Sequence, residues 1–325
     1  VSKSSYFGIV DTAGFEKDTY YLYRSQWNKA SNTLHLVTAW DSDNMYTTGG
    51  KTPVVIYSNA PTVKLYRNGT LIGTATRKAN TSAAGHTYYT YTTTSNSSSV
   101  CTAVNASGSA GLYATFNVTY ASGTISAKAY DANGTEITAS CAGNTSVSTP
   151  GSVSKLNVSK DKEEIVADGS SLSYITVDVT DANGILDTTA TNLISFSLSG
   201  NGEIVGVDNG DQATTAKYQQ PSVLTSSSSA KISAYAGKAL VIVRSTKDAG
   251  SFTLTASASG LSGGSVTVIT TEDPDAPKQD GLISYAFVRD YSVKAGNVPI
   301  LSTEATGLMA DGTEITGTIA WDEIP

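Results

Sequence analysis

Several residue types and patterns are scarce in this sequence. There are two cysteines, two methionines, two histidines and six phenylalanines among 325 residues. No run approaches the roughly 20 consecutive apolar residues that a membrane-spanning helix needs, so we predict no membrane span. Lys and Arg number 21 against 28 Asp and Glu, which gives a net charge of -7. This charge argues against nucleic acid and anionic membranes as partners.

The first residues, VSKSSYFG, contain neither an initiator methionine nor a basic segment followed by an apolar one. We therefore expect no signal peptide here, and we expect an excised piece or mature segment of a longer protein. Abundant Ser, Thr and Asn with little Cys are typical of extracellular bacterial modules. The composition therefore predicts a secreted or bacterial cell-surface protein.

Patterns that carry common enzyme chemistry are also missing. Glycoside hydrolysis needs two carboxylates on opposite sides of one bond. The nearest candidates are Glu163 with Glu164 and Asp41 with Asp43, but adjacent residues of a strand point to opposite faces and suit a solvated edge. The two histidines have no partners at zinc spacing, and no Gly-x-Ser-x-Gly motif occurs. We predict no catalytic residue, no metal site and no cofactor.

Two acidic segments resemble fragments of a calcium loop, Asp181-Ala182-Asn183-Gly184 and Asp208-Asn209-Gly210-Asp211. The twelve-residue spacing with its terminal Glu is missing, so turns of the Asx-Gly type are the better interpretation. The tetrapeptide Asp-Ala-Asn-Gly also occurs at 131–134. Its recurrence suggests related modules in tandem, with a period too irregular for a solenoid.

The sequence is rich in Tyr, Thr, Ser, Gly and Asn, a composition that favours half-buried pleated strands joined by turns. The stretch 54–74 shows the pattern most clearly. Val63 and Leu65 alternate with polar residues, and Asn68-Gly69 is a strong hairpin signal because both positions of the turn need positive φ. We predict a mostly β protein.

Short predicted strands separated by turn signals predict tandem immunoglobulin-like β-sandwiches. Residues 30–148 form the first predicted sandwich, 152–272 the second, and 281–325 part of a bacterial immunoglobulin-like domain. Linkers are predicted around Pro150 and at 273–277, and surface loops at 95–111 and 219–229. The predicted strands are Leu34–Trp40, Pro53–Ser58, Thr62–Arg67, Leu71–Arg77, His86–Thr93, Leu112–Thr119, Thr124–Tyr130, Glu136–Ala139, Tyr174–Thr180, Leu193–Leu198, Glu203–Val207, Ala239–Arg244, Ser251–Ala258, Ser265–Thr270, Ile283–Val288, Val298–Thr303 and Thr316–Trp321.

Residues 1–29 differ from the rest. A short strand and a loop precede a helix for which Asp18 is the expected N-cap, with Tyr20, Tyr23 and Trp27 on one face. One strand and one helix cannot form a core. The segment must therefore dock onto the first sandwich or leave these aromatic residues exposed.

Two further groups of residues leave alternatives open. Trp27, Trp40 and Trp321 could stack on sugar, and Trp40 is the best candidate because it ends a strand beside a polar loop; core packing is the more common role of Trp. Cys101 and Cys141 bracket one predicted pair of strands. They form either a disulfide or two separate thiols.

Residues 5–27, SYFGIVDTAGFEKDTYYLYRSQW, resemble the end of the catalytic barrel of bacterial glycoside hydrolase family 2, especially its large surface β-galactosidases. The resemblance implies that residues 1–29 are the last strand and helix of a (β/α)8 barrel. Segments of 34–69 are similar to the immunoglobulin-like domain that follows the barrel. Later segments resemble further accessory sandwiches, at 167–175, 206–211, 237–241 and 291–325.

In this family, both catalytic glutamates lie before the final strand of the barrel. The resemblance therefore implies a parent enzyme that hydrolyses terminal β-galactosides with retention, and a fragment that is inactive alone. Its implied role is that of a non-catalytic accessory region, with the upstream barrel and galactose-containing glycans as partners. A carbohydrate-binding or adhesin module and a subunit of a split β-galactosidase are the alternatives.

Overall fold

The computed structural model of the chain describes residues 7–37, 39–41, 47, 50–105, 109–215, 217–219, 224–274, 283–287, 303–309 and 314–318. Two compact units divide the chain, Val1–Thr271 and Glu272–Pro325. The predicted β class is confirmed, because strands dominate the described residues and helix α1 is short.

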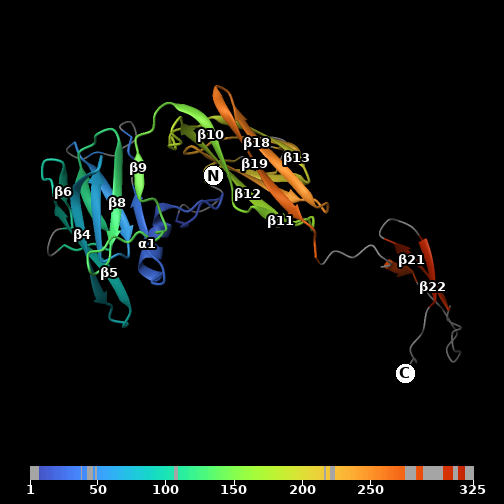
Figure 1. Cartoon of the computed structure of the whole chain (residues 1–325), viewed down its shortest axis with the longest axis horizontal. Helices are drawn as coiled ribbons and strands as arrows, with labels where there is room; N and C mark the ends of the chain where they lie inside the picture. Colours follow the sequence, from blue (N-terminus) through green and yellow to red (C-terminus); the bar gives the residue numbers. More distant parts are fainter. Residues whose placement is uncertain are drawn as a thin grey trace. The chain divides into compact units, whose positions relative to one another are not determined.

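Two antiparallel sheets face each other in the first part of the larger unit (Figure 1). Their strand orders are β1-β2-β7-β6 and β5-β4-β3-β8-β9. The strands are Leu34–Val37 (β1), Thr52–Ser58 (β2), Thr62–Arg67 (β3), Thr70–Thr81 (β4), Thr87–Ser95 (β5), Cys101–Ala103 (β6), Ala114–Val118 (β7), Thr124–Tyr130 (β8) and Ser146–Ser148 (β9).

The apolar side chains between these sheets form one buried cluster. On β3, Val63 and Leu65 are fully buried while their neighbours are half-buried, as the alternation predicts. The ring of Phe116 on β7 packs against Gly73 on β4, where an added Cβ would lie 2.5 Å from the ring. This glycine therefore lets the two sheets pack closely.

Two further sheets form the second sandwich, in the orders β14-β17-β12-β10 and β19-β18-β13-β16-β15. They are joined along one edge by a parallel pairing of β10 with β19, and β11 also pairs with β19. The strands are Val153–Lys160 (β10), Glu164–Val166 (β11), Leu172–Asp181 (β12), Leu193–Gly200 (β13), Gly202–Asp208 (β14), Leu224–Ser226 (β15), Ser229–Ser233 (β16), Lys238–Ser245 (β17), Gly250–Ala258 (β18) and Leu261–Thr271 (β19).

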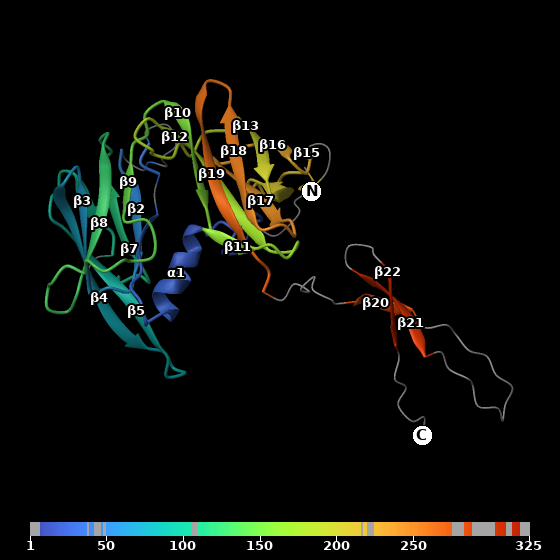
Figure 2. The same cartoon turned by 45° about the vertical axis from the view of Figure 1, so that its right-hand side comes forward.

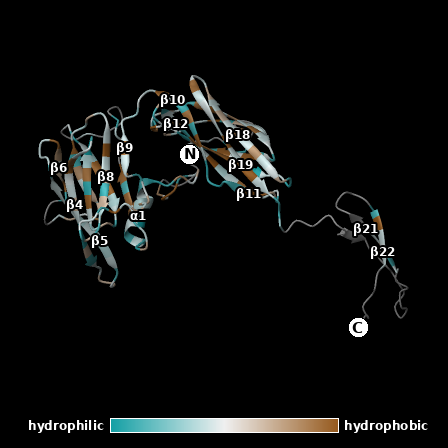
Figure 3. Cartoon of the chain, viewed as in Figure 1, coloured by the Kyte–Doolittle hydropathy of each residue, from teal (hydrophilic) through white to brown (hydrophobic). Residues whose placement is uncertain are grey.

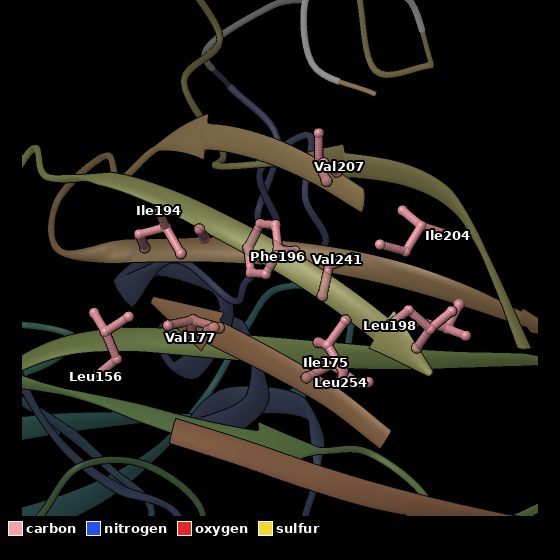
Figure 4. Packing of buried hydrophobic residues seen from close by; sticks show 14 of the residues in the cluster. Leu156, Ile175, Val177, Ile194, Phe196, Leu198, Ile204, Val207, Val241 and Leu254 are labelled. Carbon is pink, nitrogen blue, oxygen red and sulfur yellow. The ribbon is translucent and has the colours of Figure 1, made fainter. Parts of the chain in front are cut away.

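A second apolar cluster fills this sandwich and is separate from the first. Val177 from β12 and Val241 from β17 lie on one side, and Phe196 and Leu198 from β13 lie on the other (Figure 4). Hydrophobic and hydrophilic residues alternate along many of the strands (Figure 3). Each sandwich thus has its own core.

The smaller unit contains an antiparallel sheet of order β20-β21-β22. Its strands are Ile283–Phe287 (β20), Glu304–Met309 (β21) and Glu314–Thr318 (β22). Most of the predicted strand Val298–Thr303 lies outside the described residues, as do Asp43 and Trp321.

Helix α1 spans Asp18–Trp27 and lies alongside the first sandwich, where it contacts β1 and β2 (Figures 1 and 2). Its N-cap is Lys17, one residue before Asp18, the expected N-cap. Asp18 instead lies in the first turn, where its charge suits the helix dipole. Within the described residues, no helix has the length and apolar character needed to cross a membrane.

Some predicted elements differ from the structure. The predicted surface loop at 95–111 contains β6, because Cys101–Ala103 pairs with β7. Asn105 and Gly111 also hydrogen-bond back to Thr93 and Tyr91. The predicted strand at 136–139 is reduced to an isolated bridge at Glu136.

Candidate functional site

Three loops of the larger unit share one Asp-x-x-Gly turn, beginning at Asp11, Asp131 and Asp181. In each, the Oδ1 atom of the Asp accepts the backbone N–H groups of residues i+2 and i+4 at 2.8 to 2.9 Å. The glycine at i+3 has φ of 85°, 81° and 84°, respectively. Backbone donors therefore use the Oδ1 atoms, as the turn interpretation of 181–184 requires.

The first of these turns lies against the second sandwich. The Thr12 hydroxyl donates to Oδ1 of Asp208 over 3.5 Å. Gly210 approaches Asp11 so closely that an added Cβ would lie 2.2 Å from Asp11 Oδ2. Gly210 also has φ of +78°, so both its conformation and this approach require glycine.

Burial at this contact raises the pKa of the Asp11 carboxyl. The backbone N–H groups of Phe15 and Ala13 oppose the rise because they stabilise the carboxylate, and the nearby charge of Asp208 adds to it. Lys238 places its ammonium 5.6 Å from the ring of Phe15. The turn at 11–15 is therefore held by polar and aromatic contacts together.

A groove of about 860 Å³ lies beside this contact. Its floor is the outer face of β12, β14 and β17, which contributes Leu172, Val205 and Ile242. Tyr174 and Tyr218 also line it and are 41% and 37% exposed. The groove thus combines an apolar floor with two accessible aromatic rings.

Asp208 is the one carboxylate among the described residues that line this groove, and it is 5% exposed. Its Oδ1 atom also accepts the N–H groups of Asn209 and Gly210 at 2.7 and 3.0 Å. The N–H of Val207 donates to the carbonyl of Tyr218 at 3.2 Å, which holds that segment beside β14. One carboxylate cannot provide the acid and the nucleophile or base that glycoside hydrolysis needs, but it can accept hydrogen bonds from a ligand.

Helix α1 docks onto the first sandwich through the face that carries Asp18, Tyr21 and Ser25. The Tyr21 ring stacks on His35 of β1 at 4.0 Å between centroids. Asp18 Oδ1 lies 2.8 Å from Nε2 of His35, and the Asn144 N–H donates to Nδ1 at 3.0 Å. Both ring nitrogens of this buried histidine are therefore occupied, which fits a structural role.

Gln26 extends this docking to the edge strand β5. Its side-chain amide donates to the carbonyls of Tyr89 and Leu112 at 3.2 and 3.1 Å, and its carbonyl accepts the Tyr89 N–H at 2.8 Å. Gln26 thus pairs with backbone groups that an edge strand otherwise leaves open.

The other face of α1 remains exposed. Tyr23 and Trp27 are 42% and 74% exposed, and their rings lie 4.8 Å apart. With Leu22, Leu112 and Tyr88 they line a groove of about 710 Å³. Both outcomes expected for this segment thus occur, docking by one face and exposure of the other.

Trp40, the candidate for sugar contact, is a core residue. It is 1% exposed, belongs to the first buried cluster and donates from Nε1 to the carbonyl of Ala121 at 3.0 Å. It also borders a cavity of about 400 Å³ with Asn144 and Leu186. The structure corrects the expectation from loop placement, because the ring packs inward beside Tyr120 and offers no exposed face.

The disulfide considered for Cys101 and Cys141 is not formed, and both are free thiols. Cys101 is in β6, while Cys141 precedes the bridge between Ala142 and Thr33 next to β1. Strands β6 and β1 are the two edges of one four-stranded sheet, about 14 Å apart at the usual strand spacing, and Cys141 lies next to β1 and outside the sheet. A disulfide needs Cα atoms within about 7 Å, so this arrangement excludes it.

The acidic candidates do not form a pair of carboxylates facing one site among the described residues. Glu163 and Glu164 are both exposed, and Glu163 pairs with Lys160 at 2.5 Å. Asp41 is half-buried beside residues that the structure does not describe. His86 is exposed in the turn after β4.

Comparisons with known proteins support the resemblance seen in the sequence. Residues 156–267 match the family described as glycoside hydrolase family 2 C-terminal domain 5, and residues 49–138 match a domain of unknown function (DUF4982). The chain is 29% identical over 261 residues to the β-galactosidase BoGH2A of Bacteroides ovatus, covering 80% of this chain and 25% of that protein.

Solved structures agree with these matches. A β-glycosidase from Bacteroides vulgatus has a TM-score of 0.61 and 25% identity, covering 83% of this chain and 28% of that one. A glycosyl hydrolase family 2 member from Bacteroides cellulosilyticus has a TM-score of 0.57 and 26% identity, covering 81% and 32%. The chain spans between a quarter and a third of the length of these relatives. The predicted resemblance to family 2 glycoside hydrolases is thereby confirmed.

Proposed function

We propose that this chain is a non-catalytic accessory region of a secreted glycoside hydrolase family 2 enzyme of the β-galactosidase type. Residues 1–29 would supply the last strand and helix of a (β/α)8 barrel. The two sandwiches would be immunoglobulin-like domains that hold this segment in place, and residues 281–325 would begin a further one. The matches to family 2 proteins support this assignment.

The exposed apolar surface of residues 7–27 is the observation that carries the proposal. Phe7, Val10, Tyr23 and Trp27 are 96%, 42%, 42% and 74% exposed. Soluble proteins seldom leave large aromatic side chains grouped on one segment in water unless they meet a partner. A barrel would cover these residues while the opposite face of α1 keeps its contacts with the first sandwich.

In a (β/α)8 barrel, the loops after the strands lie on the face that carries the active site. Residues 11–15 would be the last of these loops, and they contact the second sandwich through Thr12 and Asp208. We propose that the second sandwich supports the barrel at this loop, while the first supports it through α1.

Association with the upstream polypeptide tests the proposal. We expect the chain to bind the barrel-bearing polypeptide encoded immediately upstream, and we expect Trp27→Ser combined with Tyr23→Ser to weaken binding at least about tenfold through the loss of apolar contact. Tyr235→Ser is the matched control, because Tyr235 is 49% exposed but lies in the second sandwich. Affinity measured by calorimetry, with thermal melts to verify folding, gives the comparison.

Two results would contradict the proposal. One is turnover of a chromogenic β-galactoside by the purified chain alone. The other is binding to the upstream polypeptide that the double variant and the Tyr235 control weaken equally. Secretion is tested separately, because a protein on the cell surface or in the medium must be accessible to added protease in intact cells.

A further inference from the structure

We propose that the groove lined by Tyr174, Tyr218 and Asp208 binds an uncharged sugar ring. The inference goes beyond the accessory role, because the groove's described lining lies within this chain and can be tested without a barrel. The groove's volume of about 860 Å³ is in the range of small-molecule sites.

The floor of the groove is an apolar patch on the outside of a sheet. In the register of the strands, Ile242 on β17 lies between Tyr174 on β12 and Gly206 on β14. A bulge between Ile204 and Gly206 interrupts the pairing at this point, and Gly206 leaves bare backbone beside Ile242. Bulges often occur next to binding sites because they alter the direction of neighbouring side chains.

Ion pairs border this patch along the strands. Arg244 pairs with Glu203 at 2.6 Å on one side, and Lys238 pairs with Asp178 at 2.7 Å on the other. The outer face is therefore polar where water covers it and apolar only within the groove. An apolar patch with a polar rim is the usual appearance of a binding surface.

The chemistry of the lining favours a sugar. The two half-accessible tyrosine rings offer flat faces for C–H groups, and the Tyr174 hydroxyl can donate or accept hydrogen bonds. The Tyr218 hydroxyl is already hydrogen-bonded to Thr12 and Asp208, which holds its ring in place. Asp208 can accept hydrogen bonds from ligand hydroxyls, and Thr12 lies at the same end of the groove. A pyranose combines an apolar face with a ring of hydroxyls and matches both features. The described lining carries one anion, Asp208, and one cation, Lys217. The groove therefore has no net charge to attract an ionic ligand, and we infer an uncharged one.

Saturation-transfer NMR and calorimetry with the whole chain test this site. The probes are methyl β-D-galactopyranoside and methyl β-D-glucopyranoside, with methyl β-D-glucuronide as the charged comparison. We expect at least one uncharged probe to bind in the millimolar range, more tightly than the glucuronide. Tyr174→Ala and Tyr218→Ala should each raise the Kd about fivefold to tenfold, because each removes one stacking face.

Tyr235→Ala is the control, since Tyr235 is also an exposed tyrosine of the second sandwich but does not line the groove. Thermal melts verify that each variant folds, and Gly206→Leu blocks the floor without removing a ring. Three results would overturn the inference: no binding of either uncharged probe, glucuronide binding as tight as theirs, or equal effects of the groove variants and Tyr235→Ala. None of these would affect association with an upstream barrel, so the two proposals fail separately.

Discussion

Asp181 connects the second sandwich to the linker that precedes it. Its Oδ2 atom accepts the Gly151 N–H at 2.9 Å, in addition to the two turn bonds that Oδ1 accepts from Asn183 and Ile185. These backbone donors stabilise the carboxylate and hold its pKa below the usual value of 3.8, and the Gly151 N–H has the largest effect. The side chain is 3% exposed, so it has little water to replace them.

We predict that Asp181→Asn lowers the unfolding temperature by several degrees, because an amide nitrogen would face a backbone donor. Since the folded pKa is lowered, the stabilisation is fully present above pH 3.8 and is lost as the pH falls through the folded pKa. The difference between wild type and variant should therefore shrink below this pH. Thermal melts between neutral and acid pH measure it.

Asp131→Asn is the matched control for this prediction. Asp131 makes the same two turn bonds in the first sandwich, and no linker donor to its side chain is among the described contacts. We expect a smaller loss of stability. Equal losses in the two variants would contradict the role assigned to Gly151.

Single residues were predicted with uneven success, and environment explains the difference. The turn at 181–184 was correctly interpreted because its hydrogen bonds and its positive-φ glycine all lie within five consecutive residues. The packing of Trp40 and the separation of Cys101 from Cys141 depend on which strands become neighbours. Local sequence carries no information on that order.

At the scale of elements, the sequence of β17 indicates that both of its faces are covered. Ala239–Val243 is a run of five apolar residues, whereas a strand with one face in water alternates. Such a run indicates a strand that is covered on both faces. The inner face meets the second core, and loop 11–15 and the groove lie over Leu240 and Ile242.

The strands that were not predicted are short or polar. Strand β6 has three residues, and β16 has the sequence SAKIS, with one fully buried residue. Strand β10 has a single fully buried residue, Leu156. Pairing with neighbours determines these strands, because their own alternation is too weak to distinguish them from loops.

Gly210 leaves room for Asp11 to approach the second sandwich, and we predict that Gly210→Ala releases the loop at 11–15. The variant introduces a left-handed penalty of about 1 to 2 kcal/mol and a Cβ in contact with Asp11. We expect faster tryptic cleavage after Lys17, measured by mass spectrometry under native conditions.

Gly260→Ala separates these two effects. Gly260 has φ of +76° and no atom within 4 Å of an added Cβ. It should lose similar stability while cleavage after Lys17 stays at the wild-type rate. If both variants accelerate cleavage equally, general destabilisation and not the Asp11 contact is the cause.

For the whole molecule, two buried clusters in one compact unit predict two thermal transitions. Phe116→Ala and Phe252→Ala each remove a fully buried ring, at a cost of about 3 to 5 kcal/mol. Differential scanning calorimetry should show each variant lowering a different transition. A single transition that both variants lower would mean that the two sandwiches unfold together.

The chain joins the two sandwiches twice. One join is the linker around Pro150, and the other is the short stretch between Phe15, which lies against Lys238, and Asp18, which holds His35. The two sandwiches, the linker and the docked segment therefore form a closed loop, which is held partly by peptide bonds and partly by noncovalent contacts. A single proteolytic cleavage at either connection would leave the two sandwiches attached. They would separate only after a second cleavage or after the docked segment dissociates.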